Sequence, residues 1–341
     1  MSPAPIAQPA SVLPKNLWNE KGELQRPASI FRNFISSDPK SQFPAEAGRY
    51  HLYVSYACPW AHRTLIVRKL KGLEDIIPFT SVMFHMDIKG ETPDETGWKF
   101  ATTETAEPDL EVTPDPLHPD FRRVRQLYYL ADPNYSGRFT VPVLWDKKQN
   151  TIVSNESSEI IRMLNTEFNG LLPEKYANVD IYPEHLRSQI DDVNPWHYDD
   201  INNGVYKCGL GQTQFAYHGA VTKLFDSLDR VEAQLSQNAE KGSGPYYFGD
   251  VLTEVDVRLY VTLVRFDPVY VSLFKTNKKM IRYDLPHVHE YMRRLYWEDL
   301  AFKETTIMHH IKGHYFESLT MINPSGVVPE GPLPHILPLQ V

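Results

Sequence analysis

The chain is poor in cysteine, in long apolar runs and in basic charge. Only Cys58 and Cys208 occur among its 341 residues, too few for a disulfide framework or, without other ligands, a structural zinc site. No run of 18 apolar residues is present, which excludes a membrane-spanning helix. The 43 acidic residues outnumber the 35 basic ones, which argues against a dedicated nucleic-acid binder. We therefore expect a cytoplasmic protein without nucleic-acid or membrane partners.

Proline marks the two ends of the chain and helps to separate four parts. Seven prolines fall within the first 45 residues and five after residue 323, and proline disfavours both helix and central strand. We therefore predict an N-terminal arm that either drapes over the core or stays mobile, and a similar C-terminal tail. In chain order, the expected parts are the arm (1–45), a thioredoxin-like α/β domain (46–172), an all-helical domain (180–315) and a C-terminal extension (316–341).

The α/β prediction comes from strand and helix patterns that alternate along the chain. The expected elements are a strand at 50–56, a helix at 60–71, a strand at 76–84, a helix at 120–131, a hairpin at 141–153 and a helix opening at Glu156. The first three form a βαβ unit with parallel strands. From Tyr182 onward the sequence shows no pattern typical of strands. Apolar residues at helical spacing over 220–235 predict an amphipathic helix, and Thr253 is the expected N-cap of another.

Cys58 lies where the first predicted strand ends and the first helix begins. The unpaired N–H groups and positive dipole end of a helix N-terminus favour a thiolate, so we expect a lowered pKa and a reactive sulfur. The motif Cys58-Pro-Trp-Ala has Ala61 where a dithiol oxidoreductase carries its second cysteine. An external thiol must then resolve any mixed disulfide, which favours a glutathione-type cycle. An inert buried cysteine is the alternative for Cys58 and the expected state of Cys208.

Residues on both sides of the predicted hairpin suit a peptide-like ligand. Pro142, at the start of a strand, is expected to be cis and to expose the backbone of Val141 for pairing. The pair Glu156-Ser157 at a helix start offers N–H groups for a carboxylate and an acceptor for an ammonium group, although plain helix capping also explains Ser157. Two loop residues are expected to line the same cleft: Trp98 and Arg138.

Tyrosine and histidine supply further candidates. A phenol can protonate a leaving group or hydrogen-bond a thiolate, and Tyr217, Tyr270 and Tyr315 fall near predicted helix ends. Core packing is the alternative for each. His62, four residues after the cysteine of the motif, is a weaker candidate base. No metal site is expected at a loose group of histidines that lacks companion thiols or carboxylates at metal spacing: His309, His310 and His314.

These motifs resemble those of the glutathionyl-hydroquinone reductases, the Xi class of glutathione transferases, from about residue 15 to 330. The matching segments are Tyr56-Ala-Cys58-Pro-Trp-Ala-His-Arg63, Gly97-Trp98, Gly137-Arg-Phe-Thr-Val-Pro-Val-Leu-Trp145, Ser154-Asn-Glu-Ser157, Lys207-Cys-Gly209, Arg265-Phe-Asp-Pro-Val-Tyr270 and His314-Tyr-Phe316. The first segment alone also fits Omega-class transferases, and the distal ones narrow the match. The resemblance implies the glutathione transferase fold, with a thioredoxin-like N-terminal and an all-α C-terminal domain.

The same resemblance implies a reaction and a set of site residues. Glutathione would be the co-substrate. The reaction would remove the glutathionyl group from glutathionylated, often chlorinated, hydroquinones. Cys58 would form a mixed disulfide, Tyr217 would protonate the leaving aromatic carbon, and a second glutathione would release oxidised glutathione. Tyr270 and Tyr315 would lower the pKa of Cys58 by hydrogen bonding. The implied glutathione-binding residues are Trp98, Arg138, Phe139, Thr140, Val141, Glu156 and Ser157.

The resemblance also implies a homodimer, and one segment departs from the family. Leu210 and Gly211 follow Gly209 where the family usually has phenylalanine next, which is expected to reshape the helical side of the aromatic pocket. Two other functions remain open. An Omega-like thiol transferase or dehydroascorbate reductase needs the same cysteine but no tyrosine acid, and a non-catalytic binding module needs neither.

Overall fold

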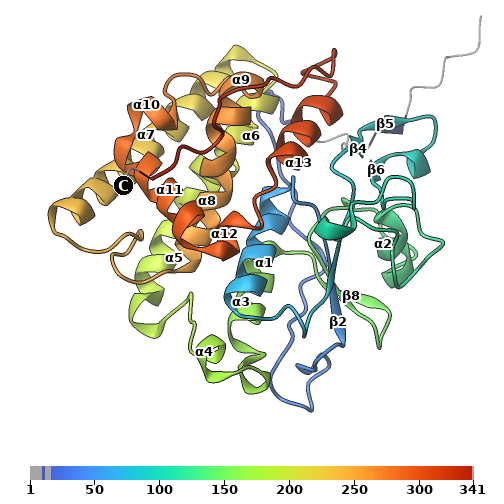
Figure 1. Ribbon diagram of the computed structural model, residues 1–341. Coiled ribbons are helices and arrows are strands. Elements are labelled where there is room, and N and C mark those ends of the chain that lie inside the picture. Colours follow the sequence, from blue (N-terminus) through green and yellow to red (C-terminus); the bar gives the residue numbers. More distant parts are fainter. Residues whose placement is uncertain (1–9, 12–16, 340–341) are drawn as a thin grey trace, which may run out of the picture.

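The computed structural model describes residues 10–11 and 17–339, and a four-stranded sheet organises its first half (Figure 1). In spatial order the strands are β3 (Phe79–Ser81), β2 (Tyr50–Val54), β7 (Val143–Asp146) and β8 (Thr151–Ser154). β3 runs parallel to β2, whereas β7 and β8 are each antiparallel to the strand before them in the sheet. This order of strands confirms the predicted thioredoxin-like fold.

Three helices cover the sheet. α1 (Pro59–Leu70) and α3 (Ser157–Thr166) pack against each other between the sheet and the helical domain, and α2 (Arg125–Ala131) packs against β8 (Figure 1). Pro59 is the first residue of α1, one residue before the predicted start of this helix, and its missing N–H leaves no partner unsatisfied there. Gly72 follows the helix with a φ of 59°, a left-handed conformation that favours glycine.

The second strand of the βαβ unit is shorter than the sequence predicts. Pairing was expected over residues 76–84 but begins only at Phe79. The amide groups of Ile76 and Ile77 instead hydrogen-bond to the carbonyl of Leu73 and close the turn after α1. An apolar run therefore contains both the turn and the strand.

Short strands and turns fill the segment between β3 and α2. β4 (Met86–Asp87) pairs with β6 (Gly97–Trp98), and β5 (Lys89–Gly90) pairs with β1 (Ala10–Ser11). Two 3₁₀ turns, η1 (Pro93–Glu95) and η2 (Pro108–Leu110), complete it. Within this segment, Trp98 packs against His314 in the C-terminal part of the chain.

The described part of the N-terminal arm lies against both domains. We call residues 17–32 the strap. At one end the Trp18 indole donates to the carbonyl of Leu210 in the helical domain (2.7 Å). Further along, the Ser29 hydroxyl donates to the carboxylate of Glu156 in the α/β domain (3.0 Å). The strap therefore joins the two domains.

The second half of the chain is helical, as predicted. Its elements are η3 (Asn169–Leu171), α4 (Glu174–Ala177), η4 (Glu184–Leu186), α5 (Arg187–Trp196), η5 (His197–Asn202), α6 (Gly204–Leu210), α7 (Gln214–Glu240), α8 (Glu254–Arg265), η6 (Phe266–Tyr270), α9 (Val271–Leu273), α10 (Ile281–Asp284), α11 (Pro286–Glu298), α12 (Leu300–Lys303), α13 (Met308–Gly313) and η7 (His314–Ser318). Thr253 caps α8 in a reciprocal capping box with Asp256, which confirms the expected N-cap. None of the described helices is both long and apolar enough to cross a membrane.

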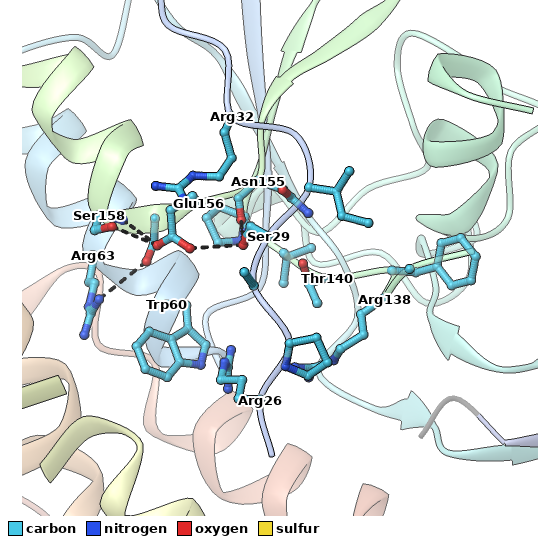
Figure 2. Close-up of a pocket in the computed structure, with 18 of the residues that line it drawn as sticks. Arg26, Ser29, Arg32, Trp60, Arg63, Arg138, Thr140, Asn155, Glu156 and Ser158 are labelled. Carbon is cyan, nitrogen blue, oxygen red and sulfur yellow. Dashed lines mark hydrogen bonds between the residues drawn. The ribbon is translucent and has the colours of Figure 1, made fainter. Parts of the chain in front are cut away.

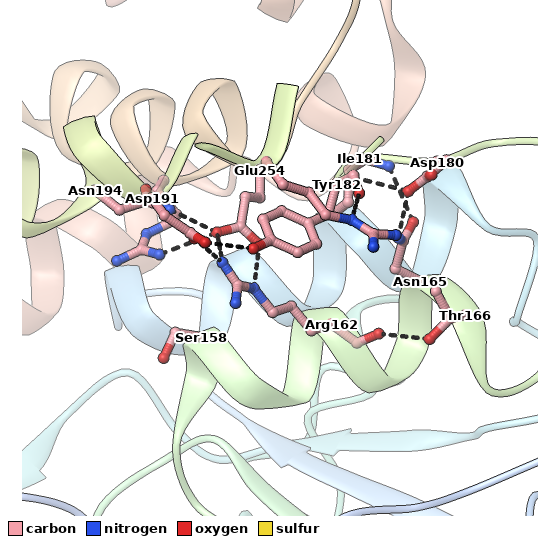
Figure 3. A network of polar contacts seen from close by, with 12 residues as sticks. Ser158, Arg162, Asn165, Thr166, Asp180, Ile181, Tyr182, Asp191, Asn194 and Glu254 are labelled. Carbon is pink, nitrogen blue, oxygen red and sulfur yellow. Dashed lines mark hydrogen bonds and ion pairs between the residues drawn. The ribbon is translucent and has the colours of Figure 1, made fainter. Parts of the chain in front are cut away.

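A buried carboxylate ties the α/β domain to the helical domain (Figure 3). Glu254 at the start of α8 is 0% exposed, and it accepts hydrogen bonds from Nε and Nη2 of Arg162 in α3 (2.9 and 3.0 Å). Asn194 of α5 and Arg258 of α8 donate to the same carboxylate. Arg162 also bonds Asp191, whose side chain is 53% exposed.

Glu254→Gln is expected to destabilise the fold by about 3 kcal/mol, because the Glu254 carboxylate is fully buried and the buried guanidinium of Arg258 loses its ion-pair partner. Asp191→Asn removes a carboxylate from the same arginine, but at an exposed position, and is expected to cost less than about 1 kcal/mol. Urea unfolding of both variants measures the difference. Equal losses of stability would show that the buried Glu254 carboxylate does not hold the domain interface.

Candidate active site

Cys58 lies at the N-terminus of α1, as the sequence predicts. It is the N-cap of the helix, with φ −77° and ψ 118°, and Pro59 follows it. Its thiol lies 3.5 Å from the carbonyl oxygen of Val141, to which it donates a weak hydrogen bond. The N–H groups of Ala61 and Trp60 are the backbone donors that act on the sulfur. The side chain is 9% exposed and its remaining surface faces a cavity.

Burial and local donors act in opposite directions on this thiol. Loss of hydration raises the pKa of Cys58, and the N–H groups of Ala61 and Trp60, with the charges of Arg26 and Arg265, lower it without cancelling that effect. The lowered pKa expected from the helix N-terminus is therefore wrong for the site as folded. The predicted donors are present, but desolvation of the thiolate is the larger effect.

Two adjoining cavities open beside the cysteine. The polar cavity, of about 810 Å³, is lined mainly by polar and charged side chains, among them Ser29, Arg63, Arg125, Glu156, Ser157 and Arg258 (Figure 2). The aromatic cavity, of about 150 Å³, is lined by apolar and aromatic side chains together with Cys58, Tyr206, His314 and Tyr315. Both cavities share Arg26, Trp60, Arg138, Phe139, Thr140 and Val141. A ligand with a polar and an apolar half can therefore span them at the sulfur.

The predicted glutathione-binding residues do not all line the same cavity. Six of them line the polar cavity: Arg138, Phe139, Thr140, Val141, Glu156 and Ser157. Trp98 instead lines the aromatic cavity, where its ring stacks on His314 with centroids 4.7 Å apart. This contact joins residues far apart in the sequence, so the sequence motif does not show it.

Glu156 is held as a carboxylate at the start of α3. It is the N-cap and not the first helical residue that the sequence predicted, because it accepts hydrogen bonds from the N–H (3.1 Å) and hydroxyl (2.9 Å) of Ser158. Burial raises the pKa of Glu156, but these bonds, the hydroxyl of Ser29 and the charge of Arg63 keep that pKa below its usual value. The site thus offers an anionic acceptor for an ammonium group beside helix N–H groups that suit a carboxylate.

The loop before β7 presents its backbone to both cavities. The peptide bond between Val141 and Pro142 is cis, as predicted. The buried Tyr128 fixes this loop, since its hydroxyl donates to the carbonyl of Thr140 (2.8 Å) and accepts the N–H of Thr140 (3.2 Å). No described residue accepts a hydrogen bond from the N–H of Val141. This group suits strand-like pairing with an extended ligand.

Three tyrosine hydroxyls form a chain that ends in the aromatic cavity. The hydroxyl of Tyr270 lies 3.0 Å from that of Tyr315, which makes a short hydrogen bond with the hydroxyl of Tyr206. Tyr206 and Tyr315 line the cavity, and Tyr270 is fully buried. Within the described chain, neither Tyr270 nor Tyr315 hydrogen-bonds Cys58. Their predicted lowering of the Cys58 pKa by hydrogen bonding is therefore wrong, because these hydroxyls bond other tyrosines.

Tyr206 lines the aromatic cavity, whereas Tyr217, which the family resemblance implies as the acid, does not. Tyr217 lines neither cavity, and its hydroxyl donates to the carbonyl of Lys275 (2.7 Å). Tyr206 directly precedes the motif residue Lys207, but sequence spacing does not show which of 19 tyrosines faces the cysteine. Burial first, and then the nearby Cys58 charge, raise the pKa of Tyr206. Its phenol therefore keeps its proton at neutral pH.

His62 and Cys208 have structural surroundings. The Nε2 atom of His62 lies 2.9 Å from the hydroxyl of Thr305, and its Nδ1 atom lies 3.1 Å from Arg265. Burial holds the pKa of His62 well below its ordinary value, and the ring lines neither cavity, which removes it as a candidate base. Cys208 is also buried outside both cavities, and burial raises its pKa to about 12. It is therefore unsuited to resolve a mixed disulfide.

One group of side chains has a composition that could hold a metal ion. Glu107, His309 and His310 place ligand atoms within 4.8 Å of one another, so a loop far away in sequence supplies the carboxylate that the histidine cluster lacks locally. However, Nδ1 of His310 is buried without a partner among the described residues, whereas a metal-bound histidine normally donates its second ring N–H to an acceptor. Glu107 instead hydrogen-bonds both histidines at 3.1–3.2 Å. The absence of a metal cofactor stays a prediction.

The chain belongs to the glutathione transferase family. Residues 57–167 match the family model "Glutathione S-transferase, N-terminal domain", and residues 214–294 match "Glutathione S-transferase, C-terminal domain". Within this family it belongs to the Xi class that its motifs resemble. The glutathione S-transferase Xi from Phanerochaete chrysosporium is 54% identical to this chain in sequence. Its crystal structure matches the present structure with a TM-score of 0.87 over 95% of this chain and 97% of that one.

Two curated relatives match nearly the whole chain. Glutathione S-transferase omega-like 2 of Schizosaccharomyces pombe is 50% identical over 94% of this chain and 96% of its own length. Glutathionyl-hydroquinone reductase YqjG of Escherichia coli is 48% identical over 91% of this chain and 89% of its own length. Glutathione is the substrate that gives this family its name.

Glu156→Gln is expected to weaken the binding of S-methylglutathione by about tenfold or more, because it removes a charge-assisted hydrogen bond to the γ-glutamyl ammonium group. Calorimetric titration measures the affinity. Glu167→Gln, at the other end of α3, is the matched control and should bind normally. An analogue without the γ-glutamyl amino group should not distinguish Glu156→Gln from the wild type. If it does, the assigned contact is wrong.

Proposed function

We propose that the protein uses glutathione to reduce S-glutathionyl-hydroquinones to hydroquinones. The observation that carries this proposal is the position of Cys58, in an aromatic cavity that adjoins a polar cavity suited to glutathione. A glutathionyl-hydroquinone has the same two halves, a charged tripeptide and an aromatic ring, joined at one sulfur. The name of the Escherichia coli relative supports the same substrate class.

In the proposed first step, the thiolate of Cys58 attacks the sulfur of the substrate. A disulfide bond forms between Cys58 and glutathione, and the bond between that sulfur and the ring carbon breaks. The electron pair goes to the ring carbon, which takes a proton from the phenol of Tyr206. Tyr315 and Tyr270 extend the hydrogen-bond chain behind Tyr206 and orient its hydroxyl.

In the proposed second step, a second glutathione thiolate attacks the glutathione sulfur of the mixed disulfide. Oxidised glutathione leaves, the Cys58 thiolate is regenerated, and the proton of the second glutathione replaces the one that Tyr206 lost. An external thiol is required because Ala61 has no sulfur and Cys208 is buried outside both cavities. The reaction consumes one glutathione for each hydroquinone released.

An Omega-type thiol transferase or dehydroascorbate reductase is the second candidate. The name of the Schizosaccharomyces pombe relative favours it, and this chemistry needs Cys58 without a phenol as acid. A non-catalytic binding module is the third candidate and requires that Cys58→Ser leaves biological activity unchanged. The anionic Glu156 and the cavity-facing sulfur argue against that third interpretation.

A homodimer in the cytoplasm is part of the same proposal. The resemblance to the Xi class supports the dimer. Both cysteines are free thiols in the structure, as a reducing compartment requires.

Tyr206→Phe is expected to slow the reduction of glutathionyl-menadiol by about a hundredfold, because the leaving carbon loses its proton donor. Exchange with hydroxyethyl disulfide should stay near the wild-type rate, since a thiolate leaving group needs no such proton. Tyr217→Phe is the matched control and should leave both rates unchanged. A wild-type protein that turns over only the disulfide would favour the Omega-type function, and equal slowing of both reactions by Tyr206→Phe would remove Tyr206 as the acid.

A further inference from the structure

The strap is fastened to the helical domain at a point of close approach. The N–H of Gln212 donates to the carbonyl of Gly22 (2.9 Å), and the hydroxyl of Thr213 donates to the carbonyl of Lys21 (2.8 Å). Gly22 has a φ of 78°, and a Cβ atom there would lie 2.9 Å from the Thr213 side chain, so glycine is required. These contacts fix the chain four residues before Arg26.

Arg26 is the strap residue that lines both cavities. Its guanidinium carbon lies 4.3 Å from the ring centroid of Trp60, two residues after Cys58 (Figure 2). Arg63 contacts the same ring at 4.5 Å but donates a hydrogen bond to Asn202 (2.9 Å). The Arg26 guanidinium has no ion pair and no hydrogen bond with any described residue. A positioned cation with unused donors therefore faces the cavity that contains the sulfur.

We propose that Arg26 stabilises the negative charge of the Cys58 sulfur and that the N-terminal strap is thus a working part of the active site. This proposal rests on the proposed function only in taking Cys58 as the reacting sulfur. A cation–π contact with Trp60 holds the Arg26 guanidinium in place and leaves the N–H groups of Arg26 available for hydrogen bonds. The charge is needed while the sulfur is a thiolate, before attack and again after the second glutathione has resolved the mixed disulfide.

The other ionisable groups that face Cys58 come from four elements. They are Arg138 in the loop before β7, Arg265 of α8, Tyr206 of α6, and His314 and Tyr315 of η7. Burial lowers the pKa of His314 to about 3 and raises the pKa of both tyrosines, so these three are neutral at pH 7. Burial also lowers the pKa of Arg138, but only to about 10, so it stays charged.

The charge of Arg26 complements that of the other two arginines. Arg265 already donates to the backbone carbonyls of Ala57, Tyr56 and Val261, so its donors are occupied. Both Arg26 and Arg265 lower the pKa of Cys58, and the effect of Arg26 is the larger. Arg26 is also only half-buried, so its replacement leaves no cavity in the core.

Arg26→Gln tests the proposal through the pH dependence of exchange between Cys58 and 4,4′-dithiodipyridine, a small neutral disulfide without carboxylates. In this reaction the thiolate forms a disulfide bond with one half of the probe and releases the other half as a thione. We expect the rate profile to move to higher pH, with exchange about threefold slower at pH 7. On the alkaline plateau the variant should be at least as fast as the wild type, because a less stabilised thiolate is more nucleophilic.

Three variants complete the experiment. Lys21→Gln removes the same charge from an exposed position of the strap and should leave the profile unchanged. Arg26→Lys keeps the charge and should return the profile most of the way to that of the wild type. Cys58→Ser supplies the blank, so that any reaction of Cys208 is subtracted.

Two results would overturn the proposal. The first is a pH profile with the neutral disulfide that Arg26→Gln does not move; slower exchange of the same variant with oxidised glutathione would then make Arg26 a carboxylate-binding residue. The second is a rate lowered equally at every pH, which is the effect of a disordered site. The neutral probe needs no hydroquinone, so failure of the proposed function would appear separately, as a wild-type protein with normal exchange but no hydroquinone release.

Discussion

The chemistry of this protein depends on the balance of charge at one sulfur atom. Cys58 is placed at a helix N-terminus, where backbone N–H groups favour an anion, but it is also buried, and burial favours the neutral thiol. In the resting site burial prevails. A group that supplies positive charge or hydrogen bonds to the sulfur therefore directly changes the reactivity of Cys58. The cations and phenols around the sulfur matter for this reason.

Elements from the whole length of the chain converge on that sulfur. The thioredoxin-like domain supplies the helix N-terminus, the loop with the cis proline and the carboxylate of Glu156. The helical domain supplies the tyrosine chain that ends at Tyr206, and the N-terminal strap supplies Arg26. The buried carboxylate of Glu254 accepts hydrogen bonds from Arg162 and so holds the two domains together, and both domains supply residues to the aromatic cavity.

The sequence predicted the features that depend on local chemistry. The βαβ unit, the helix that follows Cys58 and the cis bond before Pro142 follow from neighbouring residues, and all three are confirmed. Placement across long distances in sequence could not be predicted. Tyr206 faces the cysteine and Tyr217 does not because of how α6 and α7 pack, and Trp98 lines the aromatic cavity through its stacking on His314. The expected pKa of Cys58 was wrong because a motif shows the donors but not the burial.

The central claim is that Cys58 is one accessible thiol that exchanges with glutathione and has no partner within the chain. Mass spectrometry of the intact protein after exposure to excess oxidised glutathione tests it most directly. We predict a single glutathione adduct, located on Cys58, absent in Cys58→Ser and removed by reduced glutathione. An unmodified wild-type protein, an adduct on Cys208, or an internal disulfide between the two cysteines would contradict this claim.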